Sequence, residues 1–401
     1  MAAMSGLEVE LDPAEAGFDA ERLERIDRHF AGYVDGGKLA GWLAVVARGG
    51  RIAWVGRGGV RDLESGAPVE DGTIWRIYSM TKPITSVAAM LLYEQGAFEL
   101  KTPVAEFIPA FADSRVYRGG SELKPVTDPL LEPVRMWHLL THTSGLTYGF
   151  HYAHPTDAIY RRNGHEWTTP PGLDLAGCCE QWAAMPLRFQ PGTAWNYGVS
   201  TDVLGRVIEV ISGQPLDAFL RERIFEPLGM VDTGFAAAPE RLATLYGAGL
   251  VPLTEMGEKI KSEPVMLSGG GGLASTAADY HRFTRMLLAE GEPLLGTRTF
   301  RYMARNHLPG GADLEELGGA GFSETPYHGV GFGLGFAVVQ DPVKYKVLTS
   351  AGELAWGGAA STAFWVDRAE GVTAMFFTQL QPSSTYPLRT VFRQLVYQAL
   401  T

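Results

Sequence analysis

The sequence predicts an α+β fold in which helices flank an antiparallel sheet and a mainly helical segment interrupts the chain. Short β-rich runs lie near both ends, whereas the middle is dense in Pro, Gly and aromatic residues and carries helical patterns. A chain of 401 residues also exceeds the size at which one core usually stops growing. We expect an α/β domain from residues 1–104 and 266–401, a mainly helical domain from 105–265, and a small-molecule site in the cleft between them.

The first part of the chain predicts an amphipathic helix, a hairpin and a buried helix. The helix is expected over 19–35, where Leu23, Ile26 and Phe30 recur at helical spacing. The runs 41–48 and 51–56, joined by Gly49-Gly50, predict a hairpin, with a third strand near 59–61. An apolar run after Ser79, ending by Gly96, predicts the buried helix.

The remaining elements follow in order. Helices are expected over 135–140, 176–185, 202–211, 216–224, 279–289 and 388–400, and strands at 331–336, 347–349, 363–367 and 372–378. The glycines of 268–272 predict a tight passage before the helix at 279–289. They are not followed by Lys-Ser/Thr, so a phosphate-binding loop is excluded.

Composition excludes several partners. The net charge of -11 argues against a nucleic-acid backbone, and no apolar run approaches the ~20 residues needed to span a bilayer. Residues 1–8 are acidic and lack a secretion signal, so we expect a cytoplasmic protein. The adjacent cysteines Cys178 and Cys179 offer neither a disulfide nor metal-ligand spacing, so we expect no metal and no cofactor. Oligomeric state is not indicated.

Ser79 and Lys82 are the first candidates for chemistry. Three residues apart at the start of a helix, they share one face. A serine hydroxyl needs a base, and a lysine becomes one when burial lowers its pKa. The Ser79 N–H, at a helix start, could hold a developing oxyanion. A second copy, Ser121 to Lys124, lies in a polar, Gly-rich stretch with no apolar helix after it and carries no such meaning.

Two further segments could complete the site. Tyr197 could relay the proton as a general acid or base, and packing at a loop is the alternative. The run Trp356-Gly357-Gly358-Ala359 precedes a strand, and the Ala359 N–H could be the second oxyanion donor. A bulge or turn is the alternative. His142 could join a different triad, but the chain has no Gly-x-Ser-x-Gly elbow, so we interpret His142 as structural.

Together these motifs resemble the serine β-lactamase and penicillin-binding-protein superfamily over roughly residues 20–400. Ser79-Met80-Thr81-Lys82 matches its Ser-x-x-Lys motif, Tyr197-Gly198-Val199 lies where Tyr-x-Asn would be, and Trp356-Gly357-Gly358 lies where Lys-Thr-Gly would be. The Trp-Gly-Gly form is similar to the family VIII carboxylesterases. That resemblance implies a serine esterase for small, short-chain acyl esters, with Ser79, Lys82 and Tyr197 as catalytic residues.

The departures from the superfamily motifs concern substrate choice. Trp356 replaces the cation that holds a β-lactam carboxylate, and Val199 replaces the amide-binding Asn, so the site is expected to favour neutral, apolar acyl compounds. Tyr148, Phe150 and Tyr152 are candidate pocket walls by position, together with Trp356, Gly357, Gly358 and Val199. An acyltransferase or amide hydrolase, a weak β-lactamase or cephalosporin deacetylase, and a non-catalytic binding protein remain as alternatives.

Overall fold

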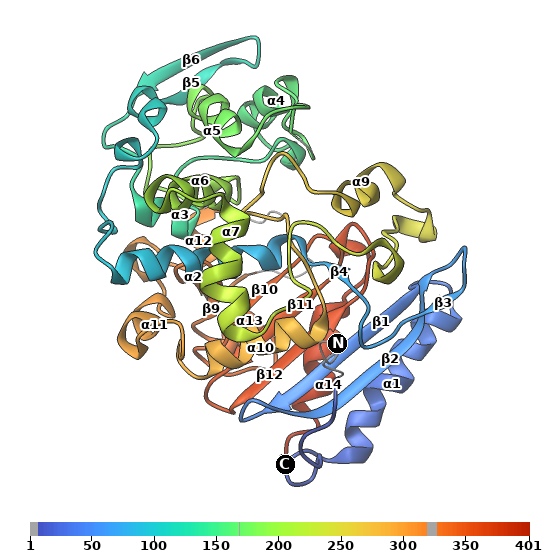
Figure 1. Cartoon of the computed structure of the whole chain (residues 1–401). Helices are drawn as coiled ribbons and strands as arrows, with labels where there is room; N and C mark the ends of the chain where they lie inside the picture. Colours follow the sequence, from blue (N-terminus) through green and yellow to red (C-terminus); the bar gives the residue numbers. More distant parts are fainter. Residues whose placement is uncertain (1–6, 168, 319–326) are drawn as a thin grey trace.

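The computed structural model describes residues 7–167, 169–318 and 327–401. Residues 1–6, which carry most of the stretch behind the cytoplasmic expectation, lie outside them. An eight-stranded antiparallel sheet has the order β3-β2-β1-β12-β11-β10-β9-β8. Its strands are β1 Gly41–Arg48, β2 Arg51–Asp62, β3 Ala67–Pro68, β8 Val330–Phe332, β9 Ala337–Val339, β10 Leu354–Gly357, β11 Ala363–Asp367 and β12 Val372–Phe377. The expected α+β fold is therefore confirmed (Figure 1).

The sheet joins segments from both ends of the chain, because β1 pairs with β12 from Leu43↔Phe377 to Arg48↔Val372. The predicted β1–β2 hairpin is confirmed, and both turn glycines, Gly49 and Gly50, have positive φ (59° and 77°), as its tight turn requires. The third strand expected near 59–61 is wrong, because β2 runs unbroken to Asp62.

Helices cover the two faces of the sheet. The α-helices of the described residues, including those away from the sheet, are α1 Ala20–Asp35, α2 Thr81–Glu94, α3 Met136–Thr141, α4 Pro155–Arg162, α5 Leu175–Ala184, α6 Ser200–Ser212, α7 Leu216–Leu220, α8 Glu226–Leu228, α9 Thr254–Glu258, α10 Ala277–Leu288, α11 Thr297–Met303, α12 Leu314–Gly318, α13 Pro342–Tyr345 and α14 Leu388–Tyr397. On one face α1 and α14 pack around Phe30, Trp42 and Phe392. On the other, α10 and α2 enclose a larger core that includes Leu43 and Val45. Alternate β1 side chains thus serve both cores.

Two strand predictions need correction near the carboxyl end. Val347–Thr349 is not a strand: it follows α13 and Lys346, whose φ is 61°, and Leu348 is 55% exposed. The strand forms instead at Leu354–Gly357, where it pairs with β9 and β11. The strand expected over 331–336 is also wrong: this segment holds the last two residues of β8 and the turn to β9, which begins at Ala337. Strand β10 was not predicted from the sequence, because Gly357 has a low β propensity.

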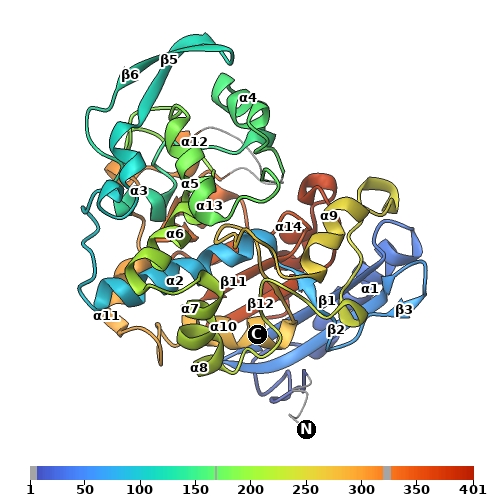
Figure 2. The ribbon, with the colours of Figure 1, turned by 45° about the horizontal axis from the view of Figure 1, so that its top comes forward.

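Residues 105–265 contain α3 to α9 and an unpredicted hairpin, β5 Arg115–Ser121 with β6 Lys124–Pro129. Helix α6 packs on α2, which links these helices to the sheet. Figure 2 shows the hairpin projecting at the end of the molecule farthest from the sheet. The second Ser-x-x-Lys copy forms its turn, with Ser121 paired to Lys124. The predicted domain boundaries stay a prediction.

Candidate active site

Ser79 lies in a single 3₁₀ turn, Tyr78–Met80, that leads into α2. The short strand β4, Trp75–Arg76, fixes the approach by pairing with β7, Ala274–Ser275. The Tyr280 hydroxyl donates to the carbonyl of Met80 at 3.0 Å. Tyr78 has a φ of 42°, which is strained for a residue with a bulky side chain. The surrounding contacts hold this unfavourable backbone and so fix the direction in which Ser79 points.

Lys82 is shut away from solvent, with 1% of its surface exposed. Its Nζ lies 3.3 Å from Ser79 Oγ, 3.0 Å from the Tyr148 hydroxyl and 2.6 Å from the carbonyl oxygen of Gly270. Burial lowers the pKa of Lys82 from 10.5 to about 7, while the Asp202 carboxylate acts in the opposite direction. An amine in this state can lose its proton near neutral pH and then accept one from Ser79.

Asp202, in the first turn of α6, acts on Lys82 through the backbone of Gly270. Its Oδ1 accepts from the Gly270 N–H at 3.0 Å and the Ser268 hydroxyl at 2.5 Å, so it fixes the turn whose Gly270 carbonyl faces Lys82. A Cβ at Gly270 would lie 2.4 Å from Asp202 Oδ2. The tight passage predicted at 268–272 therefore has a specific use: it lets a backbone carbonyl meet the buried amine.

Tyr197 completes the contact with Ser79 from the middle segment of the chain. Its buried ring centroid lies 4.5 Å from Lys82 Nζ, and its hydroxyl accepts from Trp356 Nε1 at 3.2 Å. Burial raises the pKa of Tyr197, although hydrogen bonds with Ser79 and Trp356 lower it in part. The phenol is therefore protonated at neutral pH and suited to passing a proton on rather than to holding a negative charge.

The candidate wall residues are not all brought to this group. Tyr148 is, through its hydrogen bond to Lys82, and burial raises its pKa well above 10. Phe150 stacks between Tyr148 and Trp167, with ring centroids 4.7 and 4.0 Å away. Tyr152 is 65% exposed and bonds to Glu166 on the surface. Val199 is buried in the core at the start of α6.

The end of β10 approaches the turn that carries Ser79. A Cβ at Gly358 would lie 2.4 Å from the carbonyl oxygen of Ile77, and one at Gly357 would lie 2.5 Å from Arg389 Cζ. The two glycines are thus explained by close approach to protein rather than to substrate alone. Trp356 reaches Tyr197 from here.

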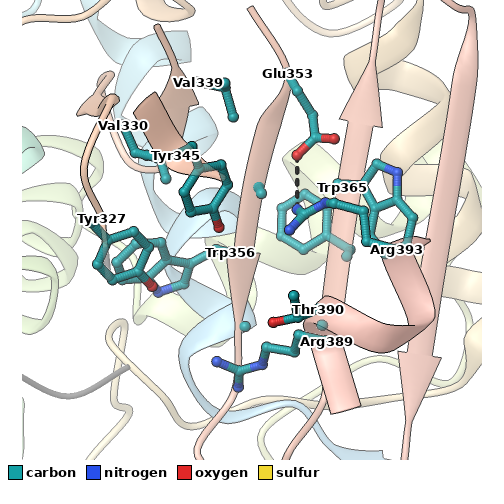
Figure 3. A pocket seen from close by; sticks show the side chains of 15 residues that line it. Tyr327, Val330, Val339, Tyr345, Glu353, Trp356, Trp365, Arg389, Thr390 and Arg393 are labelled. Carbon is teal, nitrogen blue, oxygen red and sulfur yellow. Dashed lines mark hydrogen bonds and ion pairs between the residues drawn. The ribbon is translucent and has the colours of Figure 1, made fainter. Parts of the chain in front are cut away.

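A cleft of about 380 Å³ joins these parts. Its lining consists of Ser79, Trp195, Tyr197, Tyr327, Trp356, Gly357, Gly358, Ala359, Ser383 and Arg389. A second pocket, of about 560 Å³, shares Tyr327, Trp356, Gly357 and Arg389 with it. Figure 3 shows this second pocket, with Trp356 and Tyr327 on one side and Arg389, Thr390 and Arg393 on the other.

Sequence reasoning missed Trp195, Tyr327, Asp202 and Arg389. Arg389 comes from α14, about thirty residues beyond the glycines that it crosses, and no local pattern marks such a contact. Trp195 lies two residues before Tyr197, and this proximity was the one available signal.

His142 lies beside the group without joining it. It ends α3 in a left-handed conformation, and its ring centroid is 4.9 Å from that of Tyr197. Burial, together with the charge of Lys82, lowers its pKa well below 6.5, so it stays neutral. Within the described residues, no group of three or more His, Cys, Asp or Glu side chains is arranged to hold a metal ion. No helix in the same residues is both long and apolar enough to cross a membrane.

The beta-lactamase family model matches residues 26–398, which is nearly the whole chain. The chain belongs to the beta-lactamase family. Esterase EstB of Burkholderia gladioli is 33% identical over 96% of this chain and 98% of its own length. Lovastatin esterase of Penicillium rubens is 29% identical over 86% of this chain and 89% of its own length.

A solved structure agrees with the assignment of the chain to the beta-lactamase family. EstCE1, described as a hydrolase with promiscuous acyltransferase activity, superposes with a TM-score of 0.81 at 26% identity, covering 94% of this chain and 98% of EstCE1. The relatives therefore support a serine ester hydrolase or acyltransferase rather than another chemistry of the fold.

Proposed function

We propose that the chain is a family VIII serine carboxylesterase that hydrolyses small, short-chain acyl esters through an acyl-enzyme on Ser79. The observation that carries the proposal is the contact of Lys82 Nζ with Ser79 Oγ at 3.3 Å, because burial lowers the pKa of this lysine to about 7. A buried amine with no contact to a hydroxyl would only lower the stability of the fold. Here it lies beside a hydroxyl that opens into a cleft.

In the proposed first step, neutral Lys82 removes the Ser79 proton while Oγ attacks the ester carbonyl. The N–H groups of Ser79 and Ala359 hold the resulting oxyanion. Lys82 is the better base of the two candidates, because the pKa of Tyr197 is raised and its phenol keeps its proton. Tyr197 then donates its proton to the leaving alcohol, and the proton that Lys82 took from Ser79 restores the phenol.

In the second step a water molecule attacks the acyl-enzyme. The same groups act in reverse order: the Tyr197 phenol accepts the water proton while it passes its own to neutral Lys82, and Lys82 returns a proton to Ser79 Oγ as the acid leaves. The aromatic lining by Trp195, Tyr197, Tyr327 and Trp356 favours apolar acyl groups.

The test is hydrolysis of p-nitrophenyl acetate and butyrate by the wild type and by Ser79→Ala. We expect Ser79→Ala to lose turnover at least about 10³-fold with its fold intact by circular dichroism, since the nucleophile is gone. The matched control is Ser121→Ala, which alters the serine of the other Ser-x-x-Lys copy and should keep full activity.

A Ser79→Ala variant that keeps most of the wild-type rate would contradict the proposal. Nitrocefin, assayed alongside, should be turned over far more slowly than the esters. Product analysis with added alcohol should show the free acid as the main product, and a dominant new ester would instead indicate acyl transfer.

A further inference from the structure

We propose that Arg389 is a positioning residue of the oxyanion site, which orients and polarises the peptide group between Gly358 and Ala359. The inference rests on the proposed function, in which the Ala359 N–H is one of the two donors to the oxyanion. It assigns a role to a charged side chain that comes from the last helix and lines the cleft without being part of the serine, lysine and tyrosine group.

The hydrogen bonds of Arg389 define its target. Its Nη2 donates to the Gly358 carbonyl oxygen at 2.7 Å and to the Thr362 carbonyl oxygen at 3.2 Å. The Gly358 carbonyl and the Ala359 N–H belong to one peptide group, which is trans. In a trans peptide the two groups point in opposite directions. A carbonyl held toward α14 therefore turns the Ala359 N–H away from α14.

The glycines show that this arrangement is built in. Because a Cβ at Gly357 would lie 2.5 Å from Arg389 Cζ, the guanidinium crosses the strand where no side chain intervenes. On the other side, Gly358 meets the carbonyl of Ile77, two residues before Ser79. The end of β10 is thus held between α14 and the turn that supplies the first oxyanion donor, which fixes the two donors relative to each other.

The charge adds to the geometry. A hydrogen bond from a guanidinium to a carbonyl is charge-assisted, and it polarises the peptide so that its N–H becomes a stronger donor. The negative charge that develops on the substrate oxygen would then face a stronger dipole with a cation behind it. The field of Arg389 does reach the site, because it lowers the pKa of Tyr197 against the larger effect of burial.

The experiment compares Arg389→Lys, Arg389→Gln and Arg389→Ala on p-nitrophenyl acetate. We expect Arg389→Ala to lower kcat about 10- to 100-fold with KM within about twofold, which is less than the loss of an entire oxyanion donor. Arg389→Lys should retain the most activity and Arg389→Gln an intermediate amount. Guanidinium ion should restore part of the Arg389→Ala rate. Labelling of Ser79 by a phosphonate should slow by the same factor as kcat/KM, because it forms a similar tetrahedral oxyanion.

The control is Arg301→Ala, which removes an arginine paired with Glu290 on the surface and should change none of these values. Three results would overturn the inference. The first is a kcat of Arg389→Ala within twofold of the wild type, and the second is an effect seen only as a higher KM for anionic esters. The third is an equal loss of kcat in all three variants that parallels their loss of Tm. If Arg389→Ala fails to fold, equal rates for Arg389→Lys and Arg389→Gln would overturn it. A wild type without ester turnover would instead remove the proposed function, and phosphonate labelling would still test Arg389.

Discussion

At the scale of single residues, the site depends on Lys82, which is buried but has hydrogen-bond partners. Three acceptors surround its Nζ, and Asp202 fixes one of them by binding the Gly270 N–H. Desolvation alone would lower the Lys82 pKa further, and the Asp202 charge limits this effect. The amine is therefore held close to the pH at which both protonation states are populated.

The pH dependence of the reaction follows from this lysine. A base must be deprotonated, so kcat/KM should rise with pH through an acid limb near pH 7, the value to which burial lowers the Lys82 pKa. The pH–rate profile from pH 5 to 9 measures this. Asp202→Asn should move the limb to lower pH, because the charge that raises the Lys82 pKa is gone. An unmoved limb would mean that Asp202 does not act on Lys82. His142 is not an alternative source of a limb near pH 7, because its pKa lies well below 6.5.

The grouping of the central site residues was largely predictable. Ser79, Lys82 and Tyr197 were predicted as one group from three short motifs, and the structure brings them together. Trp356 reaches the same group. Asp202 and Arg389 were not predictable, because each acts through the backbone of a distant segment and leaves no local pattern. The expectation that the site favours neutral acyl compounds did not take account of Arg389, which lines the cleft.

At the scale of elements, buried polar contacts join α14 to the residue before β10, the strand that carries Trp356. Glu353, directly before β10, accepts from Arg393 of α14 at 2.8 Å and from the Tyr397 hydroxyl at 2.8 Å. The carboxylate is fully buried and the guanidinium side chain is 8% exposed. Figure 3 shows this ion pair among the residues that line the second pocket. The strand prediction at 347–349 failed here, because long-range pairing with β9 and β11, rather than local propensity, decides where β10 forms.

Breaking this buried pair should be costly. Glu353→Ala leaves the Arg393 charge without its partner, so we expect a loss of about 3–5 kcal/mol in the free energy of unfolding, measured by urea denaturation. The double variant Glu353→Leu/Arg393→Met removes both charges and should cost clearly less than the single change. A single variant that loses under about 1 kcal/mol would contradict this account of the buried pair.

At the scale of the whole molecule, the site is assembled from segments that are remote in sequence. Ser79 comes from the turn before α2 and Lys82 from the start of α2. Tyr197 comes from the helical middle, and Trp356 and Arg389 come from the last fifty residues of the chain. The fold class and most helices were predictable from periodicity. The β5–β6 hairpin was missed, because its strands are mostly exposed and polar and so lack the apolar alternation that marks a strand.

That hairpin offers a test of which surfaces matter. Its outer part projects from the molecule, and Leu123 at the tip is 63% exposed. Replacing residues 120–125 by Asn-Gly joins Gly119 to Val126, which already face each other in the ladder. We expect kcat/KM for p-nitrophenyl butyrate within twofold of the wild type and an unchanged Tm. A loss of more than about tenfold would show that the tip takes part in substrate binding.

The burial of α2 has a consequence for how such an enzyme can diversify. Thr81 through Leu92 are all buried, so a substitution in this helix disturbs both the sheet and the neighbouring helices. Tyr327 and Trp356, which line the cleft, are only partly buried. Exchanging these cleft aromatics should therefore alter substrate preference with less disturbance of the core than any change in α2, the helix that holds Lys82.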